Sequence, residues 1–378
     1  MGAVRGVHRT AAIVTAALVL LVSAAVVASP ALSMLRGDVT TTTVRKDVKD
    51  LSSAEKAEFV SAVLASKQAR SPWNPRLSYY DQFVQWHRMA FRCSIAWEQG
   101  RNWAGAAHNS PTFLPWHRQF LDLFEQMLRD VSGNPRLALP YWDWTNPEST
   151  AAVFADDFMG GNGDPEQSYA VTTGPFRKGE WEITIQDPRI MREGLTTPKP
   201  YVVRNFGAYR DRGISLPTEE EVLATLDVHG YDHRPFNAKA PIDESFRNSL
   251  EGWRKVKRAV CENGWMFQSS NPRIGSSMHN AVHVYVGGVW SEGDKTSMGT
   301  MVYATSPNDP VFFVHHANVD RIWASWEISS RAHYRTQRGA PEGFAANDTM
   351  WPWYDRTINS WFGTERNGFR YASLPGLS

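Results

Sequence analysis

Hydrophobic side chains recur with a helical period in four segments of the chain. The first, residues 81–91, carries several large apolar side chains and neither glycine nor proline, so it predicts a helix with His87 near its middle. The second covers residues 116–128, and the proline before it favours a helix start that places His117 in the first turn. His108 lies between them, in a polar stretch that ends in proline and indicates a loop.

The other two helical segments lie near the end of the chain. Residues 276–285 predict a helix in which His279 and His283 are four positions apart and project from one face; two glycines end it. Residues 310–326 predict an amphipathic helix with a proline in its first turn, and the asparagine and aspartate before it are alternative N-caps. Residues 150–245, rich in glycine and proline, indicate a long irregular connection with small strand pairs.

The N-terminal segment predicts export. Two arginines precede an apolar run over residues 11–28, and small residues near its end offer a cleavage site. The run of about 18 residues is long for a signal peptide and just long enough to cross a bilayer. Residues 1–33 are therefore a signal peptide or an N-terminal membrane anchor, residues 34–50 a polar, threonine-rich tether, and residues 51–378 a single domain outside the cytoplasm.

Composition narrows the possible partners. The net charge is +1 and no long charge run occurs, so neither a nucleic acid nor an anionic membrane surface is an expected partner. The 16 tryptophans are an excess, which we expect to serve mainly in packing. Cys93 and Cys261 are the only cysteines; export permits a disulfide between them, but the sequence provides no distance, and two buried thiols remain the alternative.

Six histidines form two candidate metal sites. His87, His108 and His117 make up the first, and His279, His283 and one member of the pair at 315 and 316 make up the second. Three neutral imidazoles without a carboxylate suit copper and do not suit calcium or magnesium. Two such sites facing each other would form a dicopper centre. Two further histidines, at 229 and 233, also lie four apart, but a glycine and a proline argue against a helix there, so we assign them no metal.

Four long motifs carry a resemblance to a known family. They are HNSPTFLPWHRQF from residue 108, LPYWDW from residue 139, HNAVHVYVGG from residue 279 and NDPVFFVHHANVDRIW from residue 308. In this order the chain resembles the type-3 copper proteins, and among them a bacterial tyrosinase or polyphenol oxidase, over residues near 80 to 330. The resemblance implies a mainly α fold: an antiparallel four-helix bundle that holds a dicopper centre, with long irregular loops and minor β-structure.

The resemblance also implies a role for each site residue. The copper ligands would be His87, His108 and His117 for the first ion, and His279, His283 and His316 for the second. Near them, His315 would be a packed or hydrogen-bonded neighbour, Phe312 would pack over the second site, and Asp320 would pair with an arginine such as Arg118 or orient an imidazole. Tyr303 would either narrow the mouth of the second copper site or serve in ordinary packing.

A water that accepts the phenolic proton is held in some bacterial tyrosinases by an asparagine and a glutamate. Asn280 matches the asparagine, and Glu251 in a Leu-Glu-Gly-Trp segment matches the glutamate. Glu251 nevertheless lies 28 residues before His279, because residues near 254–276 resemble an insertion relative to short bacterial tyrosinases. A surface or helix-end glutamate is the alternative interpretation.

The expected activity follows from the family. Two copper ions and O2 as co-substrate would hydroxylate monophenols in the ortho position and oxidise catechols to ortho-quinones. A catechol oxidase or an o-aminophenol oxidase without monophenolase activity is one alternative, and a haemocyanin-like oxygen carrier is another. The expected partners are small phenols and a copper-delivering helper protein. Few residues follow the last motif, so we expect no C-terminal domain over the site, and we expect Tyr371 to lie in a flexible tail.

Overall fold

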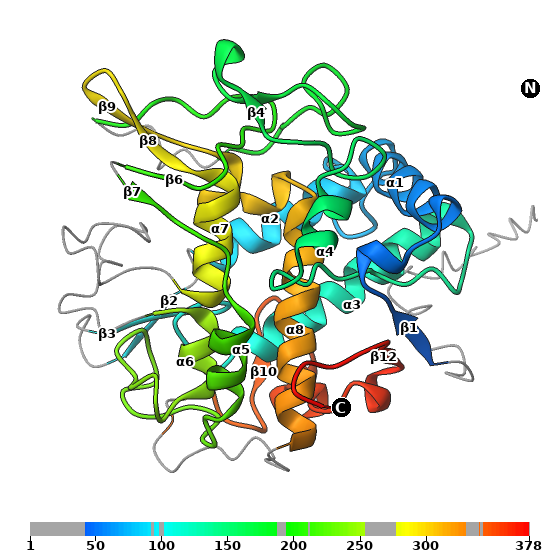
Figure 1. Cartoon of the computed structure of the whole chain (residues 1–378). Coiled ribbons are helices and arrows are strands. Elements are labelled where there is room, and N and C mark those ends of the chain that lie inside the picture. The colour runs from blue at the N-terminus through cyan, green and yellow to red at the C-terminus, as the bar shows by residue number, and fades with distance from the viewer. Residues whose placement is uncertain are drawn as a thin grey trace, which may run out of the picture. The chain divides into compact units, whose positions relative to one another are not determined.

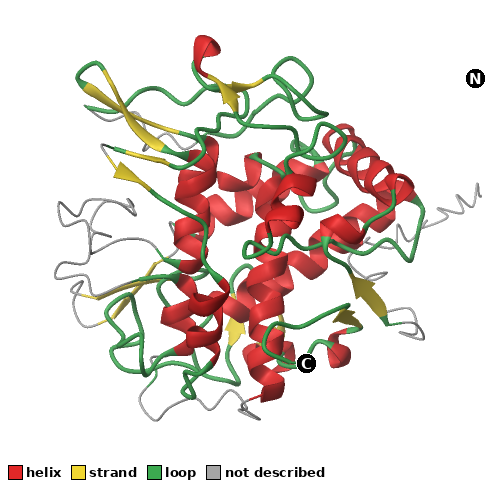
Figure 2. Cartoon of the chain, viewed as in Figure 1, coloured by secondary structure: helices red, strands yellow, loops and turns green. Residues whose placement is uncertain are grey.

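The computed structural model describes residues 42–91, 94–97, 102–186, 194–210, 212–253, 277–329, 340 and 343–377. Helices dominate these residues, with short strands at the edges (Figures 1 and 2). The helices are α1 Ser53–Gln68, α2 Tyr79–Ala90, α3 Phe113–Ser132, α4 Pro147–Val153, α5 Glu219–Leu226, α6 Phe246–Glu251, α7 Met278–Gly287 and α8 Val311–Ser329. The predicted mainly α fold is confirmed.

Helices α2, α3, α7 and α8 are the four that the hydrophobic pattern predicted. They form the four-helix bundle, in which α3 packs against α2 and α8, and α8 also packs against α7. The side chain of Ser78 accepts a hydrogen bond from the N–H of Asp81 and so caps α2, while Gly133 ends α3 in the left-handed conformation. Because α3 begins at Phe113, His117 is its fifth residue and lies beyond the first turn predicted for it.

Aromatic rings fill the space between the bundle helices. Phe124 of α3 stacks on Phe313 of α8 with ring centroids 3.4 Å apart, and Phe83 of α2 meets Phe124 edge-on at 5.4 Å. All three are fully buried. Each aromatic pair of this kind adds about 0.5–1.5 kcal/mol to the stabilisation that comes from burial alone. These contacts fix the helices that carry the histidines relative to one another.

The strands are short and lie around the bundle. They are β1 Thr43–Arg45, β2 Ser94–Trp97, β3 Asn102–Gly105, β4 Gly163–Asp164, β5 Ala170–Val171, β6 Ala208–Tyr209, β7 Arg212–Gly213, β8 Val289–Glu292, β9 Lys295–Met298, β10 Thr349–Met350, β11 Trp353–Thr357 and β12 Phe369–Tyr371. The described residues contain one four-stranded sheet, in the order β7-β6-β8-β9, and two-stranded pairs. The pairs β4–β5 and β6–β7 confirm small strand pairs in the connection before α6.

The two ends of the folded body lie side by side. Strand β1 pairs in parallel with β12, so that Arg45 lies opposite Tyr371. The Arg45 side chain is fully buried and donates to Glu125 at 2.9 Å, to Asp320 at 3.3 Å and to the Tyr371 hydroxyl at 3.2 Å. Residues 43–50 are therefore not tether, and Tyr371 is not in a flexible tail. A buried guanidinium requires paired carboxylates, and this requirement draws both segments into the core.

Several predictions concern residues outside the described part of the chain. These are the leader and anchor (residues 1–33), most of the tether up to residue 41, the insertion near 254–276, and both Cys93 and Cys261. Among the helices that are described, none is both long and apolar enough to cross a bilayer.

Candidate metal centre

The first histidine cluster joins two helices and a loop. His87 comes from α2, His117 from α3, and His108 from the connection that follows β3, as predicted. The His108 ring centroid lies 5.0 Å from that of His87 and 5.0 Å from that of His117. All three side chains are buried, with at most 3% exposed. Their ligand atoms lie within 4.8 Å of one another, close enough to surround one ion.

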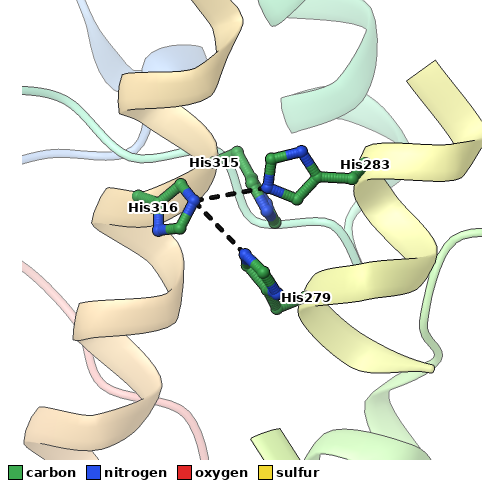
Figure 3. Close-up of side chains that lie close together, drawn as sticks. All are labelled: His279, His283, His315 and His316. Carbon is green, nitrogen blue, oxygen red and sulfur yellow. Dashed lines mark hydrogen bonds between the residues drawn. The ribbon is translucent and has the colours of Figure 1, made fainter. Parts of the chain in front are cut away.

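The second cluster joins α7 to α8 (Figure 3). His279 and His283 project from one face of α7, and the Nε2 atom of each lies 3.3 Å from Nε2 of His316 on α8. All three side chains are buried. The spacing of four residues on α7 therefore directs both imidazoles toward one point, as the sequence predicted.

Backbone carbonyls determine which nitrogen of these rings is free. His87 Nδ1 is 2.8 Å from the Ala304 carbonyl, His117 Nδ1 2.8 Å from that of Phe113, His283 Nδ1 2.7 Å from that of Met301, and His279 Nδ1 3.2 Å from that of Glu251. A carbonyl can only accept, so Nδ1 carries the proton in each neutral ring. Each Nε2 then presents a lone pair, which is the form in which histidine binds metals.

These lone pairs fit a metal ion. In the second cluster, the Nε2 lone pairs of His279 and His283 converge on Nε2 of His316, whose own Nδ1 has no hydrogen-bond partner among the described residues. Nitrogens bound about 2.0 Å from one ion in tetrahedral geometry lie about 3.3 Å apart, which is the separation observed from His316 to His279 and His283. In the first cluster, Nε2 of His87 and of His117 are buried without a hydrogen-bond partner among the described residues.

The two clusters face each other. The rings of His117 and His316 stack with centroids 4.3 Å apart and an interplanar angle of 12°. Phe312 packs 4.1 Å from His316 and 4.9 Å from His87, so one fixed ring contacts ligand candidates of both clusters. Two ions held here would be close neighbours, and a donor set of nitrogens alone selects copper or zinc over calcium and magnesium.

Burial keeps these imidazoles neutral. It lowers the pKa of His117 to about 3 and that of His283 to about 4, in each case against the opposing effect of the carbonyl on Nδ1. Burial also lowers the pKa of His87, His108, His279 and His316 well below its usual value, and neighbouring histidines add to the effect. The rings are therefore ready to bind metal at neutral pH without first losing a proton.

The copper-free protein is expected to lose stability as the pH falls from about 6.5 toward 4. The unfolded chain binds protons at its histidines with a pKa of about 6.5, whereas the folded chain does not, so acid favours unfolding. Each such histidine contributes up to about 1.4 kcal/mol per pH unit over this window. Chemical denaturation at several pH values measures the slope, and His283→Gln, which cannot titrate, should reduce it. A free energy of unfolding that stays constant from pH 7 to 4 would contradict the expectation.

Comparison with known proteins decides the family. A family model described as the common central domain of tyrosinase matches residues 77–329, which include both clusters. A tyrosinase from Streptomyces lincolnensis is 37% identical over 317 residues, covering 83% of this chain and 93% of the relative. The chain belongs to the tyrosinase family. A tyrosinase-family chain of this kind is a copper-dependent oxidoreductase that uses O2 on phenols at a pair of copper ions.

Other relatives agree with this assignment. A grixazone synthase from Streptomyces griseus subsp. griseus is 36% identical over 329 residues, covering 83% of this chain and 94% of the relative. Among solved structures, an active aurone synthase, described as a polyphenol oxidase, matches with a TM-score of 0.51 at 17% identity, covering 89% of this chain and 87% of that one. At this identity the structural match supports the fold alone.

His315 differs in part from its prediction. It is buried and stacks on His279 at 5.2 Å with an interplanar angle of 17°, so a packed neighbour is correct. A hydrogen-bonded neighbour is wrong, because neither ring nitrogen has a partner among the described residues. Its ligand atom also lies within 4.8 Å of those of the second cluster. The geometry of the tyrosinase-family site thus brings four histidines together where the family pattern uses three.

Asp320 lies one turn after His316 and contacts arginines. Its carboxylate accepts from Arg118 at 2.6 Å and from the Tyr371 hydroxyl at 2.6 Å, besides Arg45. The predicted pairing with Arg118 is confirmed, and no imidazole contacts this carboxylate in the described chain. The opposing charges keep the buried network neutral overall in the layer behind the histidines of α3 and α8.

Tyr303 lies in a small hydrophobic cluster with Val284, Val289 and Met298. It makes no ring contact with a histidine in the part of the chain that the structure describes. Burial raises the pKa of its phenol well above the usual value, so the hydroxyl stays protonated. These contacts fit ordinary packing, the second of the two interpretations predicted for Tyr303, while Tyr303 also lines a cavity with Thr305 and Asn308.

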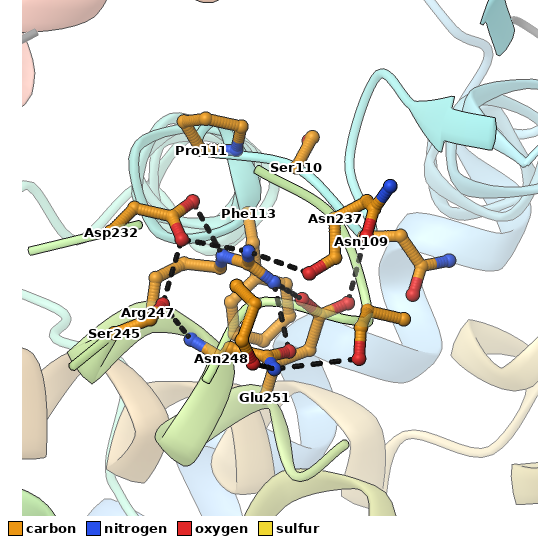
Figure 4. A network of polar contacts seen from close by, with 12 residues as sticks. Asn109, Ser110, Pro111, Phe113, Asp232, Asn237, Ser245, Arg247, Asn248 and Glu251 are labelled. Carbon is orange, nitrogen blue, oxygen red and sulfur yellow. Dashed lines mark hydrogen bonds and ion pairs between the residues drawn. The ribbon is translucent and has the colours of Figure 1, made fainter. Parts of the chain in front are cut away.

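Glu251 is brought to the site despite its distance in the sequence (Figure 4). It is fully buried, so a surface glutamate is wrong, but it is the last residue of α6, so the helix-end part of that alternative is correct. One carboxylate oxygen accepts from the backbone N–H of Asn109 at 2.7 Å and the other from Arg247 at 2.9 Å. Its own carbonyl accepts from Nδ1 of His279 at 3.2 Å. Glu251 therefore touches the loop of His108 and the first ligand candidate of α7 at once.

Gly252 allows this approach. A Cβ atom there would lie 1.8 Å from the Ser277 carbonyl oxygen, and the residue has a φ of +93°. The N–H of Ser277 in turn donates to the Gly252 carbonyl at 3.1 Å. Gly252 and Ser277, which lie on either side of Trp253 and residues 254–276 in the sequence, are thus joined by a hydrogen bond. The insertion separates Glu251 from α7 in sequence but not in space.

Asn280 lies beside Glu251 at the start of α7. Its side-chain oxygen is 3.0 Å from Nδ1 of His279, and its Nδ2 is buried without a hydrogen-bond partner among the described residues. A buried amide N–H group without a protein acceptor is normally hydrogen-bonded to a water molecule. Asn280 and Glu251 together thus offer a donor and an acceptor next to the second cluster.

Sequence analysis did not identify Arg247 and Asp232. Arg247 is one helical turn before Glu251 and also donates to Asp232 at 2.9 Å. Burial tends to lower the pKa of Arg247, but the carboxylates of Asp232 and Glu251 outweigh it and raise the pKa above its usual value. The spacing of four between an arginine and a glutamate in α6 was the available signal. Asp232 comes from a loop and left no such signal.

Proposed function

We propose that His87, His108 and His117 hold one copper ion, that His279, His283 and His316 hold the second, and that the enzyme hydroxylates monophenols and oxidises catechols to ortho-quinones. The convergence of the Nε2 atoms of His279, His283 and His316, facing three further histidines, carries the proposal. When bound, the copper pair supplies the reduction of O2 and the two-electron oxidation of the substrate. A haemocyanin-like carrier would bind O2 without turnover, so catechol oxidation separates the two functions.

The protein's own residues orient the reactants. Phe312 fixes the rings of His316 and His87, and the carbonyls on Nδ1 hold the imidazoles so that Nε2 points inward. We propose that Asn280 Nδ2 and the carboxylate of Glu251 hold a water that takes the proton from the phenol oxygen. Each oxygen of Glu251 has a second lone pair beyond the one used by Asn109 or Arg247.

Glu251 is suited to receive that proton. Burial raises the pKa of Glu251, although Arg247 and the N–H of Asn109 partly offset the effect. A carboxylate with increased proton affinity is a better base than one in water. Arg247, which stays charged between Asp232 and Glu251, keeps the carboxylate in place.

Glu251→Gln is expected to separate the two activities. Monophenol hydroxylation should fall by about 100-fold or more, because proton transfer by a positioned group contributes this much. Catechol oxidation should stay within a few-fold, since the copper pair alone accepts its electrons. Initial rates on tyrosine, catechol and o-aminophenol, measured side by side on copper-loaded protein, test this expectation.

The matched control is Glu244→Gln, at a glutamate that pairs with His233 on the surface. It should change neither activity. Equal loss of hydroxylation and catechol oxidation in Glu251→Gln would reject the water-holding role. A parent enzyme that oxidises catechol or o-aminophenol but never hydroxylates tyrosine would establish the alternative without monophenolase activity.

We also propose that residues 1–33 direct export, either as a cleaved signal or as an anchor through residues 11–28, and that a helper protein delivers copper. The burial of all six ligand candidates, none more than 3% exposed, supports a helper, because a copper ion from solution would have to reach nitrogens that are almost fully covered. The N-terminal residue of the protein recovered outside the cytoplasm distinguishes a cleaved signal from an anchor. Full copper loading of the isolated chain by copper salts alone would argue against a helper.

A further inference from the structure

Four tryptophans form a continuous row next to the first histidine cluster. The ring centroids of Trp116 and Trp353 are 5.1 Å apart, those of Trp353 and Trp86 are 5.2 Å apart, and those of Trp86 and Trp73 are 4.6 Å apart. Each step is a direct contact between indole rings. The four residues come from α3, β11, α2 and the segment before α2, so the fold assembles the row from distant parts of the sequence.

The row has one end at the copper site and the other at the surface. Trp116 is fully buried and lies 5.0 Å from the His117 ring and 6.1 Å from the His87 ring. Trp73 at the far end is 36% exposed, which is unusual for so large an apolar side chain. Packing of the core explains buried tryptophans, but it does not explain a row that leads outward to water.

Indole is among the most easily oxidised side chains, and electrons move rapidly between indole rings in contact. Phenyl rings are not oxidised under the same conditions. Phe83 and Phe120 flank the row, at 5.4 Å from Trp86 and 4.9 Å from Trp116, and do not interrupt it. Phenyl rings therefore border the middle of the row, and the oxidisable ring of Tyr79 meets its outer end, 5.6 Å from Trp73.

We propose that Trp116, Trp353, Trp86 and Trp73 form an electron-transfer chain that protects the copper ligands when a catalytic cycle fails to find substrate. This inference rests on the proposed function, which supplies O2 as the oxidant. One electron passes from Trp116 to the oxidised copper pair, and successive transfers from Trp353, Trp86 and Trp73 refill each ring in turn. A phenol at the protein surface, which has not entered the copper site, then gives an electron to Trp73 and its hydroxyl proton to water.

The electrons balance in each transfer along the row. One external phenol is oxidised by one electron, the copper pair is reduced by one electron, and the tryptophans return to their starting state. Without the row, the oxidising equivalent remains beside the buried imidazoles until a substrate molecule enters the site. With it, the equivalent leaves the core and is removed by a molecule that the enzyme already meets as substrate.

Trp353 is the best position for a test. It lies in the middle of the row, away from the histidines, and its indole N–H has no hydrogen-bond partner among the described residues. Trp353→Phe therefore removes no hydrogen bond but interrupts the chain, whereas Trp353→Tyr also removes the indole but retains an oxidisable ring. Trp290→Phe is the matched control, because Trp290 is also a half-buried strand residue and pairs with Tyr169 outside the row.

The experiment compares the copper-loaded full chain of each variant under O2 with limiting catechol. Initial catechol oxidation should be unchanged in all of them. Trp353→Phe should complete at least about threefold fewer turnovers before inactivation, while Trp353→Tyr and Trp290→Phe match the parent. Peptide mass spectrometry should show oxidation products at Trp73 in the parent, and in Trp353→Phe a shift of these products to His87, His117 and Trp116.

Two outcomes would overturn the inference. One is an equal number of turnovers in the parent and Trp353→Phe; the other is an equal loss in Trp353→Phe and Trp353→Tyr, which would indicate a packing role. Oxidation of Trp73 that persists in Trp353→Phe would also overturn the inference. A parent without any catechol oxidation would instead reject the proposed function, so the two failures are distinguishable.

Discussion

Replacing His283 with alanine is expected to leave one copper ion per chain and to abolish catechol oxidation. His283 Nδ1 is held by the Met301 carbonyl, and its Nε2 lies 3.3 Å from that of His316. Removing the imidazole leaves the second cluster with two of its three proposed ligands. Loss of a residue that only supports a metal ligand costs about 10–100-fold in affinity or activity, so loss of a ligand should exceed about 100-fold. Metal analysis and catechol turnover measure the two effects.

His233→Ala is the matched control for this variant. His233 pairs with Glu244 near the surface and lies outside both clusters, so copper content and activity should remain at the parent level. A His283→Ala protein that retains two copper ions and full turnover would remove His283 from the ligand set. Two zinc ions per chain in the parent, with no oxidation of catechol, would reject the dicopper function itself.

Replacing Asp320 with alanine is expected to lower the free energy of unfolding by about 3–5 kcal/mol, because removing one carboxylate from a buried ion-pair network leaves excess positive charge in the core. Arg45 retains Glu125 and Arg118 retains Glu327. Asp320 is 3% exposed and forms ion pairs with Arg118 and Arg45, both of which are fully buried. It also accepts from the Tyr371 hydroxyl at 2.6 Å. Denaturant titration of the copper-free protein measures the loss, which should exceed that of an exposed pair severalfold.

Two variants make this result interpretable. Asp157→Ala removes a carboxylate that is 55% exposed and pairs with Lys56, so it should cost about 1 kcal/mol or less. Asp320→Asn retains a hydrogen-bond acceptor without the charge. Its loss in free energy of unfolding should lie between the losses of Asp320→Ala and Asp157→Ala. Equal losses in Asp320→Ala and Asp157→Ala would show that the buried network contributes no more than a surface pair.

The site could be predicted to the extent that its geometry is local. His279 and His283 share a helical face because four residues make about one turn, and the apolar stripes of α2 and α3 located His87 and His117. Local patterns also located α8, where Asp309 accepts from the N–H of Val311. These features depend on neighbours within a few positions.

The remaining features depend on contacts between distant segments. Arg45 and Tyr371 are 326 residues apart and meet on Asp320, which no periodicity in either segment reveals. A polar, threonine-rich stretch therefore predicted a tether where the fold has a strand. Likewise, the burial of Glu251 follows from the close approach of Gly252 to Ser277. The 28-residue separation of Glu251 from His279 had instead suggested a glutamate away from the site.

The hydrogen bond between Ser277 and Gly252 has an evolutionary consequence. Since Gly252 and Ser277 are held together by this bond, segments of other lengths can be exchanged between them while the histidines, Asn280 and the aromatic rings behind them keep their positions. The junction is thus a natural place for a family of oxidases to diversify, and for protein engineers to graft a peptide of choice beside an intact reaction centre.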